Sequence, residues 1–232
     1  MIRRAFLRAL WGDALIPRSR TKISRDVRIS TTYRYPLPTR TYCYGLDNRR
    51  LLRENGVEPI MLSKVGIVNF FGRCRRRASS LVNWGCNMWR HKLVAIAAAL
   101  DDCDEVVWLD WDCLALHPLP DGFWERLALG APVQASLRQY HRIKCPWRST
   151  GRRLVPGGAF LYVRGRDTID ELLDLHAENR RWDDETTIAR WTDLQQGGWQ
   201  SCERYVEDGF EPFCYQIRGQ VFPPEVPLFT AG

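Results

Sequence analysis

The chain has 232 residues, of which 45% are hydrophobic and 26% are charged, and its formal net charge is +7. This length suits one sizeable α/β core, and the composition is that of an ordinary globular protein. Residues 1–40 contain ten Lys or Arg and two acids, so they carry a charge of +8, while residues 41–232 sum to −1. The basic charge therefore lies outside the main body of the chain, which argues against a nucleic-acid-binding domain.

The eight cysteines are scattered, and no two of them form a CxxC pair. This spacing gives no support to a structural zinc site or to a disulfide framework. The apolar stretch near the N-terminus is interrupted by Arg8 and is too short for a signal peptide or a membrane-spanning helix. We therefore expect a reduced, cytoplasmic protein.

Residues 1–38 are predicted to form a basic arm, followed by a single domain over residues 39–232 with an irregular C-terminal segment. Arg3, Arg4 and Arg8 could line one side of a short amphipathic helix. Such a helix would contact an anionic surface, peripherally at the inner face of the membrane. A solvated, partly disordered N-terminus is the alternative.

A βαβ unit is predicted within residues 41–62. Thr41–Tyr44 reads as a strand, residues 49–55 as a helix that ends at Gly56, and residues 59–62 as a second strand. Two strands joined by a helix in this way indicate a parallel sheet. The polar loop after the first strand, Gly45–Asn48, would lie at the carboxyl edge of that sheet, where ligands gather.

A helix rich in Ala and Leu is predicted over residues 88–100. Arg90 and Lys92 lie in its first turn, where cations oppose the helix dipole. Local stability therefore does not account for them. A helix N-terminus with added cations is an anion site, so a phosphate-facing role would explain their position.

The apolar residues 106–109 favour a buried strand, and the acids Asp110 and Asp112 follow it directly. Paired carboxylates at the carboxyl end of a strand suit Mn²⁺ or Mg²⁺, because these cations prefer oxygen ligands. The alternative is a turn capped by Asp, although a cap needs only one carboxylate.

Downstream, a further strand is predicted over residues 159–163, entered through Gly157 and Gly158. Between the two glycines and an expected strand at 131–137, residues 139–155 read as a basic loop. Amphipathic helices are expected at 167–180 and 183–191, and the second has Asp184 and Glu185 in its first turn. Acids there also suit the helix dipole without any catalytic role.

Four segments in this order resemble the nucleotide-sugar-dependent glycosyltransferases of the GT-A fold, over about residues 40–192. They are YGLDNRRLLRENG, the strand ending in DxD with its preceding basic helix, VPGGAFLYVRG and WDDETTIARW. The resemblance implies an α/β fold of the Rossmann-like type, with a mostly parallel central sheet flanked by helices. It implies a glycosyltransferase, and specifically a hexosyltransferase, that moves a sugar from a UDP- or GDP-linked donor to the hydroxyl of an unidentified carbohydrate, lipid-linked or protein acceptor.

The same resemblance implies roles for individual residues. Asp112 would bind the metal directly, and Asp110 would contact the metal, its water shell or the ribose. Asp184 or Glu185 would serve as the base or face the donor sugar. The remaining donor-binding positions would be Gly45, Asp47 and Asn48 near the base or ribose, Arg90 and Lys92 near the diphosphate, and Gly157 and Gly158 beside the sugar.

One departure from that family concerns the metal. Many retaining members complete the metal sphere with a histidine close to the C-terminus, but the last histidine here is His176, expected as a packed or surface helix residue. Water or another residue near the end would then fill the position, with Asp208, Glu211 and Gln216 as candidates.

Two other interpretations remain. A strand followed by DxD also occurs in haloacid-dehalogenase-like phosphatases, in which the first Asp is a nucleophile and the second an acid/base. Here Leu114 replaces their usual Thr or Val, and about a hundred residues precede the motif. The second interpretation is a non-catalytic relative that binds carbohydrate through its aromatic surface.

Overall fold

The computed structural model describes residues 2–10, 27, 37–63, 90–111, 113–115, 118–119, 121–139, 154–178, 184–194, 200–201 and 214–216. Within these residues the chain forms a seven-stranded sheet in the order β3-β2-β1-β4-β7-β6-β8, and a separate two-stranded sheet of β5 and β9. In the large sheet, β7 (Leu154–Arg164) is antiparallel to its neighbours β4 (Glu105–Leu109) and β6 (Val133–Gln139).

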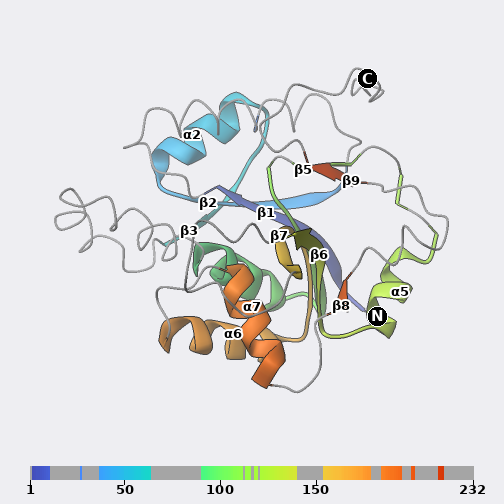
Figure 1. The fold of residues 1–232 in the computed structure, drawn as a ribbon. Coiled ribbons are helices and arrows are strands. Elements are labelled where there is room, and N and C mark those ends of the chain that lie inside the picture. Colours follow the sequence, from blue (N-terminus) through green and yellow to red (C-terminus); the bar gives the residue numbers. More distant parts are fainter. Residues whose placement is uncertain are drawn as a thin grey trace.

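The other neighbouring strands of the large sheet pair in parallel. They are β1 (Arg4–Leu10), β2 (Thr39–Tyr44), β3 (Ile60–Leu62) and the short β8 (Gln200–Ser201), together with β4 and β6 as named above. The small sheet joins β5 (Cys113–Ala115) to β9 (Cys214–Gln216). The predicted α/β class with a mostly parallel sheet and flanking helices is therefore confirmed (Figure 1).

The predicted βαβ unit is confirmed as β2, α2 (Leu46–Glu54) and β3, with β2 and β3 in parallel register. Residues 90–100 are helical, as expected, and the other described helices are α5 (Phe123–Leu129), α6 (Arg166–Glu178) and α7 (Asp184–Leu194). The strand expected at 159–163 is longer, since β7 begins at Leu154. The central part of the expected basic loop, residues 140–153, lies outside the described residues.

The prediction of a basic arm is wrong for residues 4–10. They form β1, which lies between β2 and β4 in the interior of the sheet. Spacing of the arginines suggested a helix face, but the apolar residues between them are buried on both sides of the sheet. Arg4 pairs with Glu105 at 2.5 Å, and Arg8 Nη2 donates to a main-chain carbonyl. A membrane-contacting helix at these residues is thereby excluded.

Side chains alternate between the two faces of the sheet, as the strand period requires. On one face Leu7, Trp108 and Leu161 pack against the helix at 90–100, α6 and α7. On the other face Phe6 and Leu109 pack against α5, and Cys43 packs against α2. The sheet is therefore the middle layer of three, with α6 and α7 below it and α2 above it in Figure 1.

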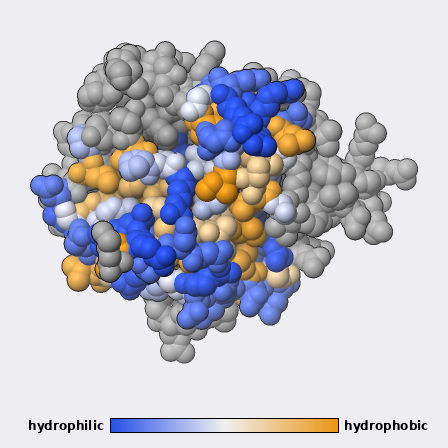
Figure 2. All heavy atoms as spheres, turned by 180° about the vertical axis from the view of Figure 1, so that it is seen from behind, coloured by the Kyte–Doolittle hydropathy of each residue, from blue (hydrophilic) through white to orange (hydrophobic). Residues whose placement is uncertain are grey.

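The surface is chemically mixed. Figure 2 shows hydrophilic and hydrophobic side chains together on the face turned away from the viewer of Figure 1. Large apolar side chains are exposed at Leu46, Ile60, Met61 and Leu129, among others. No described helix has both the length and the apolar character that crossing a membrane would require.

Candidate functional site

Asp110 follows β4 at the carboxyl edge of the four parallel strands β1 to β4. Its main-chain N–H donates to the carbonyl of Ala159 in β7 at 2.9 Å. Its carboxylate Oδ1 accepts the indole N–H of Trp108 at 2.7 Å, and the side chain is 25% exposed. The acid is therefore held on two sides by the sheet while one quarter of its surface remains open to solvent.

Lys92 lies under this acid with its side chain only 1% exposed. Its ammonium Nζ donates to Asp184 Oδ2 at 2.6 Å and to the carbonyl oxygen of Gly158 at 2.7 Å. Asp110 Oδ1 lies 3.4 Å from the same nitrogen, and the ring of Trp108 lies 5.2 Å away. One buried cation thus joins the helix at 90–100 to β7, to the end of β4 and to the start of α7.

Burial by itself lowers the pKa of the Lys92 ammonium, since desolvation disfavours the charged form. The negative charges of Asp110 and Asp184 and the hydrogen bond to Asp184 outweigh it, so the pKa of Lys92 is raised above its ordinary value. Lys92 therefore remains a cation at neutral pH, and the two acids share its charge.

Gly158 provides the close approach that this cluster needs. A Cβ atom at this position would overlap the carboxylate of Asp184 and would lie 2.8 Å from Lys92 Nζ. The main-chain N–H of Gly158 also donates to Glu185 Oε1 at 3.2 Å. Any side chain at this position would push the ion pair away from β7, so the packing of the cluster requires glycine at position 158.

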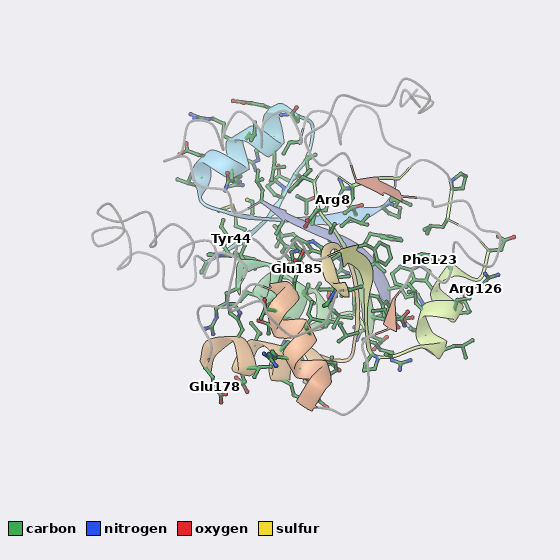
Figure 3. All side chains as sticks on the ribbon, viewed as in Figure 1. Arg8, Tyr44, Phe123, Arg126, Glu178 and Glu185 are labelled. Atoms are coloured by element: carbon green, nitrogen blue, oxygen red, sulfur yellow. The ribbon has the colours of Figure 1, made fainter. Side chains whose placement is uncertain are left out.

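Asp184 is the first residue of α7, where the positive end of the helix dipole favours a carboxylate. It is 2% exposed, whereas Glu185 beside it is partly exposed and lies at the start of α7 below the sheet (Figure 3). Behind Asp184, the buried His176 of α6 has its Nδ1 3.0 Å from the hydroxyl of Thr187. Burial and the charge of Arg90 lower the pKa of His176 to about 4, so the ring is neutral at pH 7.

The structure thus brings together five of the residues singled out in the sequence, namely Lys92, Asp110, Gly158, Asp184 and Glu185. Gly157 precedes Gly158 in β7 and is buried. Asp112 lies outside the described residues, as do Asp208 and Glu211, and the side chain of Gln216 is not described. The predicted roles of all these residues toward a donor or a metal stay predictions.

The loop after β2 shows how its polar residues are used. Gly45 has φ = 87°, a left-handed conformation that glycine adopts without strain, and α2 begins directly after it. The amide of Asn48 donates to the carbonyls of Tyr44 at 2.8 Å and Leu10 at 3.3 Å, which fixes α2 to the ends of β1 and β2. Asp47 is exposed and pairs with Arg50. Of the two polar side chains of this loop, Asp47 is therefore the more accessible.

Arg90 lies at the beginning of the described part of its helix and is partly buried. Among the described residues, its Nε has no hydrogen-bond partner. Lys92, by contrast, uses its ammonium on acceptors from the protein itself. The two cations that the sequence assigned together to a diphosphate thus have different surroundings.

The described residues do not by themselves make a metal centre, because nowhere do they bring three or more His, Cys, Asp or Glu side chains together as ligands. Of the two predicted metal ligands, Asp110 is described, and its Oδ1 accepts from Trp108 and lies beside Lys92. A divalent cation at this position would therefore depend on Asp112 and on further residues beyond those described.

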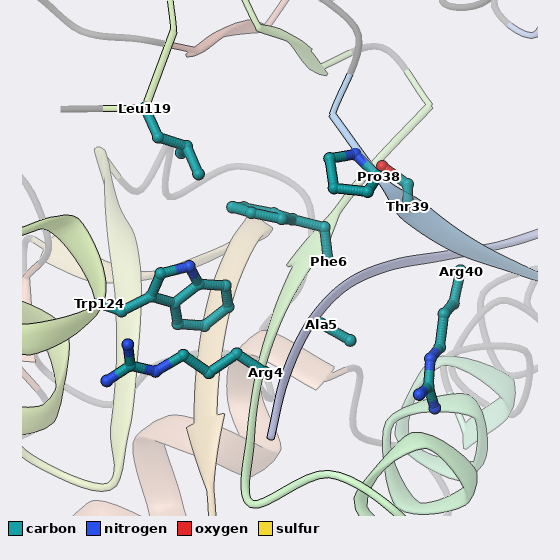
Figure 4. A pocket seen from close by; sticks show the side chains of 8 residues that line it. All are labelled: Arg4, Ala5, Phe6, Pro38, Thr39, Arg40, Leu119 and Trp124. Carbon is teal, nitrogen blue, oxygen red and sulfur yellow. The ribbon is translucent and has the colours of Figure 1, made fainter. Parts of the chain in front are cut away.

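A pocket of about 530 Å³ opens elsewhere, beside the N-terminal halves of β1 and β2 (Figure 4). Phe6, Leu119 and Trp124 give it an apolar lining, and Arg4 and Arg40 add charge. Both arginines pair with acids, Arg4 with Glu105 and Glu125 and Arg40 with Asp102. The pocket does not include any residue of the acid–lysine cluster.

Two contributors to the site were not expected from the sequence. Trp108 reads as a core residue of a strand, yet its indole N–H orients Asp110. Arg8 reads as a surface cation, yet it is fully buried and donates to the carbonyl of Cys113, just beyond Asp112. The sequence signal for the buried Arg8 was its position within an apolar run, and that run was interpreted as one face of an amphipathic helix.

The molecule is thus a mixed α/β protein with a buried acid–lysine cluster at the carboxyl edge of its sheet. No family model matches the sequence, and no curated protein matches it significantly. Among solved structures, the chain is similar to two glycosyltransferases. With the glycosyltransferase GlyE of Streptococcus pneumoniae TIGR4 it has a TM-score of 0.46 at 16% identity over 89% of this chain, and with the apo form a TM-score of 0.39 at 15% identity over 88%.

With the galactosyltransferase LgtC, solved in complex with donor and acceptor sugar analogues, it has a TM-score of 0.46 at 14% identity over 85% of this chain. The match covers 72% of the LgtC chain but only 46% of either GlyE chain. The present chain therefore spans less than half the length of GlyE.

Proposed function

We propose that the protein is a glycosyltransferase that moves a sugar from a UDP- or GDP-linked donor to a hydroxyl group of an acceptor. The observation that supports this most directly is the bridge from Asp110 through Lys92 to Asp184. The three residues belong to two of the four sequence segments that resemble such enzymes, and they meet at the edge of the sheet where α/β proteins bind ligands.

The site offers two kinds of group to a sugar nucleotide. The open part of the Asp110 carboxylate can accept hydrogen bonds from donor hydroxyls. The second group is the partly exposed carboxylate of Glu185, which accepts the N–H of Gly158 at the point where the missing side chain leaves room for Asp184 and Lys92. We assign Lys92 the task of holding Asp110 and Asp184 in place, since its N–H groups are directed at acceptors of the protein.

In the transfer step, the bond between the anomeric carbon and the diphosphate oxygen breaks, and a bond from that carbon to the acceptor oxygen forms. The leaving diphosphate keeps the electron pair, and the acceptor hydroxyl releases a proton. Asp184 or Glu185 would take that proton if the enzyme inverts configuration. Glu185 is the more exposed of the two and needs no movement of the buried ion pair.

The part of the proposal that concerns a divalent cation is supported only by the sequence motif at Asp110 and Asp112. Mn²⁺ or Mg²⁺ would be held by Asp112 together with Asp110, and when bound it would supply charge to neutralise the leaving diphosphate. Titration of Mn²⁺ into the wild-type protein and into an Asp112→Ala variant tests this part separately. Equal binding to both proteins would remove Asp112 from the metal site.

The function itself is tested by incubating the protein with UDP- and GDP-sugars and measuring the nucleoside diphosphate released. We expect release from at least one donor and, because a transition-state contact is lost, a rate about 100-fold lower in Asp110→Asn. A generic phosphate monoester serves as the second substrate. Its hydrolysis, with no turnover of any sugar nucleotide, would favour the phosphatase interpretation instead.

A further inference from the structure

Arg8 is an arginine in the middle of an interior strand, and none of its surface is exposed to solvent. Burying a charge costs several kcal/mol unless hydrogen bonds and nearby groups compensate for it. A leucine at this position would continue the apolar run of β1 at no such cost. The contacts of the guanidinium therefore indicate why a cation stands here.

Those contacts lead to the residues that follow β4. Arg8 Nη2 donates to the carbonyl oxygen of Cys113 at 2.7 Å, and the guanidinium carbon lies 5.4 Å from the ring centre of Trp111. The indole N–H of Trp111 in turn donates to the carbonyl of Ala9, the neighbour of Arg8 in β1, at 2.9 Å. Arg8 and Trp111 thus form a two-point connection between β1 and the segment 110–113.

The same segment is closed on itself and attached to β7. The main-chain N–H of Cys113 donates to the carbonyl of Asp110 at 2.9 Å, and with Trp111 these described residues make up what is here called the 110–113 turn. At its start the N–H of Asp110 donates to Ala159, and at its end the thiol of Cys113 lies 3.4 Å from the same carbonyl. Arg8 holds the side of the turn that faces β1, away from Lys92.

Arg8 and Lys92 act from opposite faces of the sheet. Phe6 and Leu10, the neighbours of Arg8 along one side of β1, pack on the face of α5 and α2. Lys92 and Glu185 lie on the other face, with the helix at 90–100 and α7. Figure 3 labels Arg8 close to β1 and Glu185 below it, at the start of α7. The turn that begins with Asp110 is therefore held between two buried cations.

We propose that Arg8 is a positioning residue, whose guanidinium holds the 110–113 turn against β1 and so fixes the turn for donor binding. This inference rests on the proposed function, because it assigns the turn to the donor site. Arg8 touches no substrate in this account and acts through Cys113 and Trp111. A site needs its groups within about 0.5 Å of the productive geometry, and the bond from Arg8 adds one more constraint on the position of the turn.

The test compares Arg8→Met and Arg8→Lys with Phe6→Leu as the matched control. Phe6 lies on the same strand and face and is equally buried, but its contacts are with α5. Two quantities are measured: amide hydrogen exchange at Cys113, and the dissociation constant of UDP and of GDP. Because Arg8→Met removes a charged hydrogen bond, we expect about tenfold faster exchange at Cys113 and about tenfold weaker nucleotide binding.

Arg8→Lys keeps the charge without the planar fork and should restore part of both quantities. Phe6→Leu should lower the melting temperature but leave exchange at Cys113 and nucleotide binding as in the wild type. If folded Arg8→Met shows wild-type exchange and binding, the inference is overturned. If the wild-type protein binds neither UDP nor GDP, the donor site and the proposed function are overturned. Amide exchange at Cys113 then still shows whether Arg8 holds the turn against β1.

Should Arg8→Met fail to fold, Arg8→Lys carries the test of the guanidinium, and Trp111→Phe tests the second contact of the same connection, because it keeps the ring beside Arg8 but loses the hydrogen bond to Ala9. Exchange at Cys113 should then rise about threefold or more, in line with the loss of one neutral hydrogen bond. Unchanged exchange in this variant would contradict the connection between β1 and the turn.

Discussion

Replacing Lys92 by methionine should destabilise the protein more than most single substitutions. The buried ammonium donates hydrogen bonds to the Asp184 carboxylate at 2.6 Å and to the Gly158 carbonyl at 2.7 Å. The Asp110 carboxylate lies 3.4 Å from the same nitrogen. Methionine fills a similar volume but leaves the Asp184 carboxylate, whose side chain is 3% exposed, without its cation. Removing one partner of a buried ion pair costs about 3–5 kcal/mol.

For a chain of this size, that cost corresponds to a fall in melting temperature of roughly 6–20 °C. Urea denaturation at pH 7 measures the free energy of unfolding, and thermal melting measures the temperature. Arg50→Met is the control, because Arg50 forms ion pairs with Asp47 and Glu54 at the surface and exposed pairs contribute little.

The double variant Lys92→Met/Asp184→Asn separates the loss of charge balance from the loss of packing. Because Asn carries no charge, the double variant should be more stable than Lys92→Met alone. Lys92→Met with wild-type stability would refute the reasoning. So would a double variant no more stable than the single one, since the penalty would then not come from the buried carboxylate.

Two further predictions concern the surroundings of this ion pair. Gly158→Ala places a methyl group against Asp184 and Lys92, and should lower the free energy of unfolding by about 1–3 kcal/mol in urea titrations; an unchanged value would show that the pair can shift without cost. His176 is neutral in the folded protein because burial and Arg90 lower its pKa to about 4, while the unfolded chain takes up the proton below about pH 6.5. The stabilisation that the neutral ring gives the folded protein is therefore fully present above about pH 6.5. It is lost as the pH falls from 6.5 toward 4, and the free energy of unfolding decreases by about 3 kcal/mol over this range. His176→Asn should lack this component of the pH profile, and a profile parallel to that of the wild type would count against a neutral buried ring.

The sequence was sufficient for those elements whose signals are local. The apolar residues before Asp110 predicted β4, and the strand–helix–strand order predicted the parallel pairing of β2 and β3. Gly158 was predicted to precede the strand at 159–163 and to allow close approach of a ligand, but it lies within β7 and the groups packed against it are Asp184 and Lys92. These elements could be predicted because the spacing of apolar residues and the turn-forming residues that define each one lie within a short stretch of the sequence.

Features that depend on distant residues were not accessible in this way. Lys92 and Asp184 are 92 positions apart, so nothing local shows that the ammonium is used by the protein. Arg8 and Cys113 are 105 positions apart, and without that acceptor an arginine among apolar residues reads as part of a surface helix. The interior position of β1 was missed for the same reason, since its neighbours β2 and β4 come later in the chain.

The central claim is that the edge of the sheet around Asp110 binds a sugar nucleotide, and a thermal-shift screen of UDP- and GDP-sugars tests it most directly. The screen is run with and without Mn²⁺, because no acceptor is needed for binding. The account predicts that at least one donor raises the melting temperature of the wild-type protein, and that Asp110→Ala abolishes the rise. A melting temperature that no donor changes, with or without Mn²⁺, would contradict it.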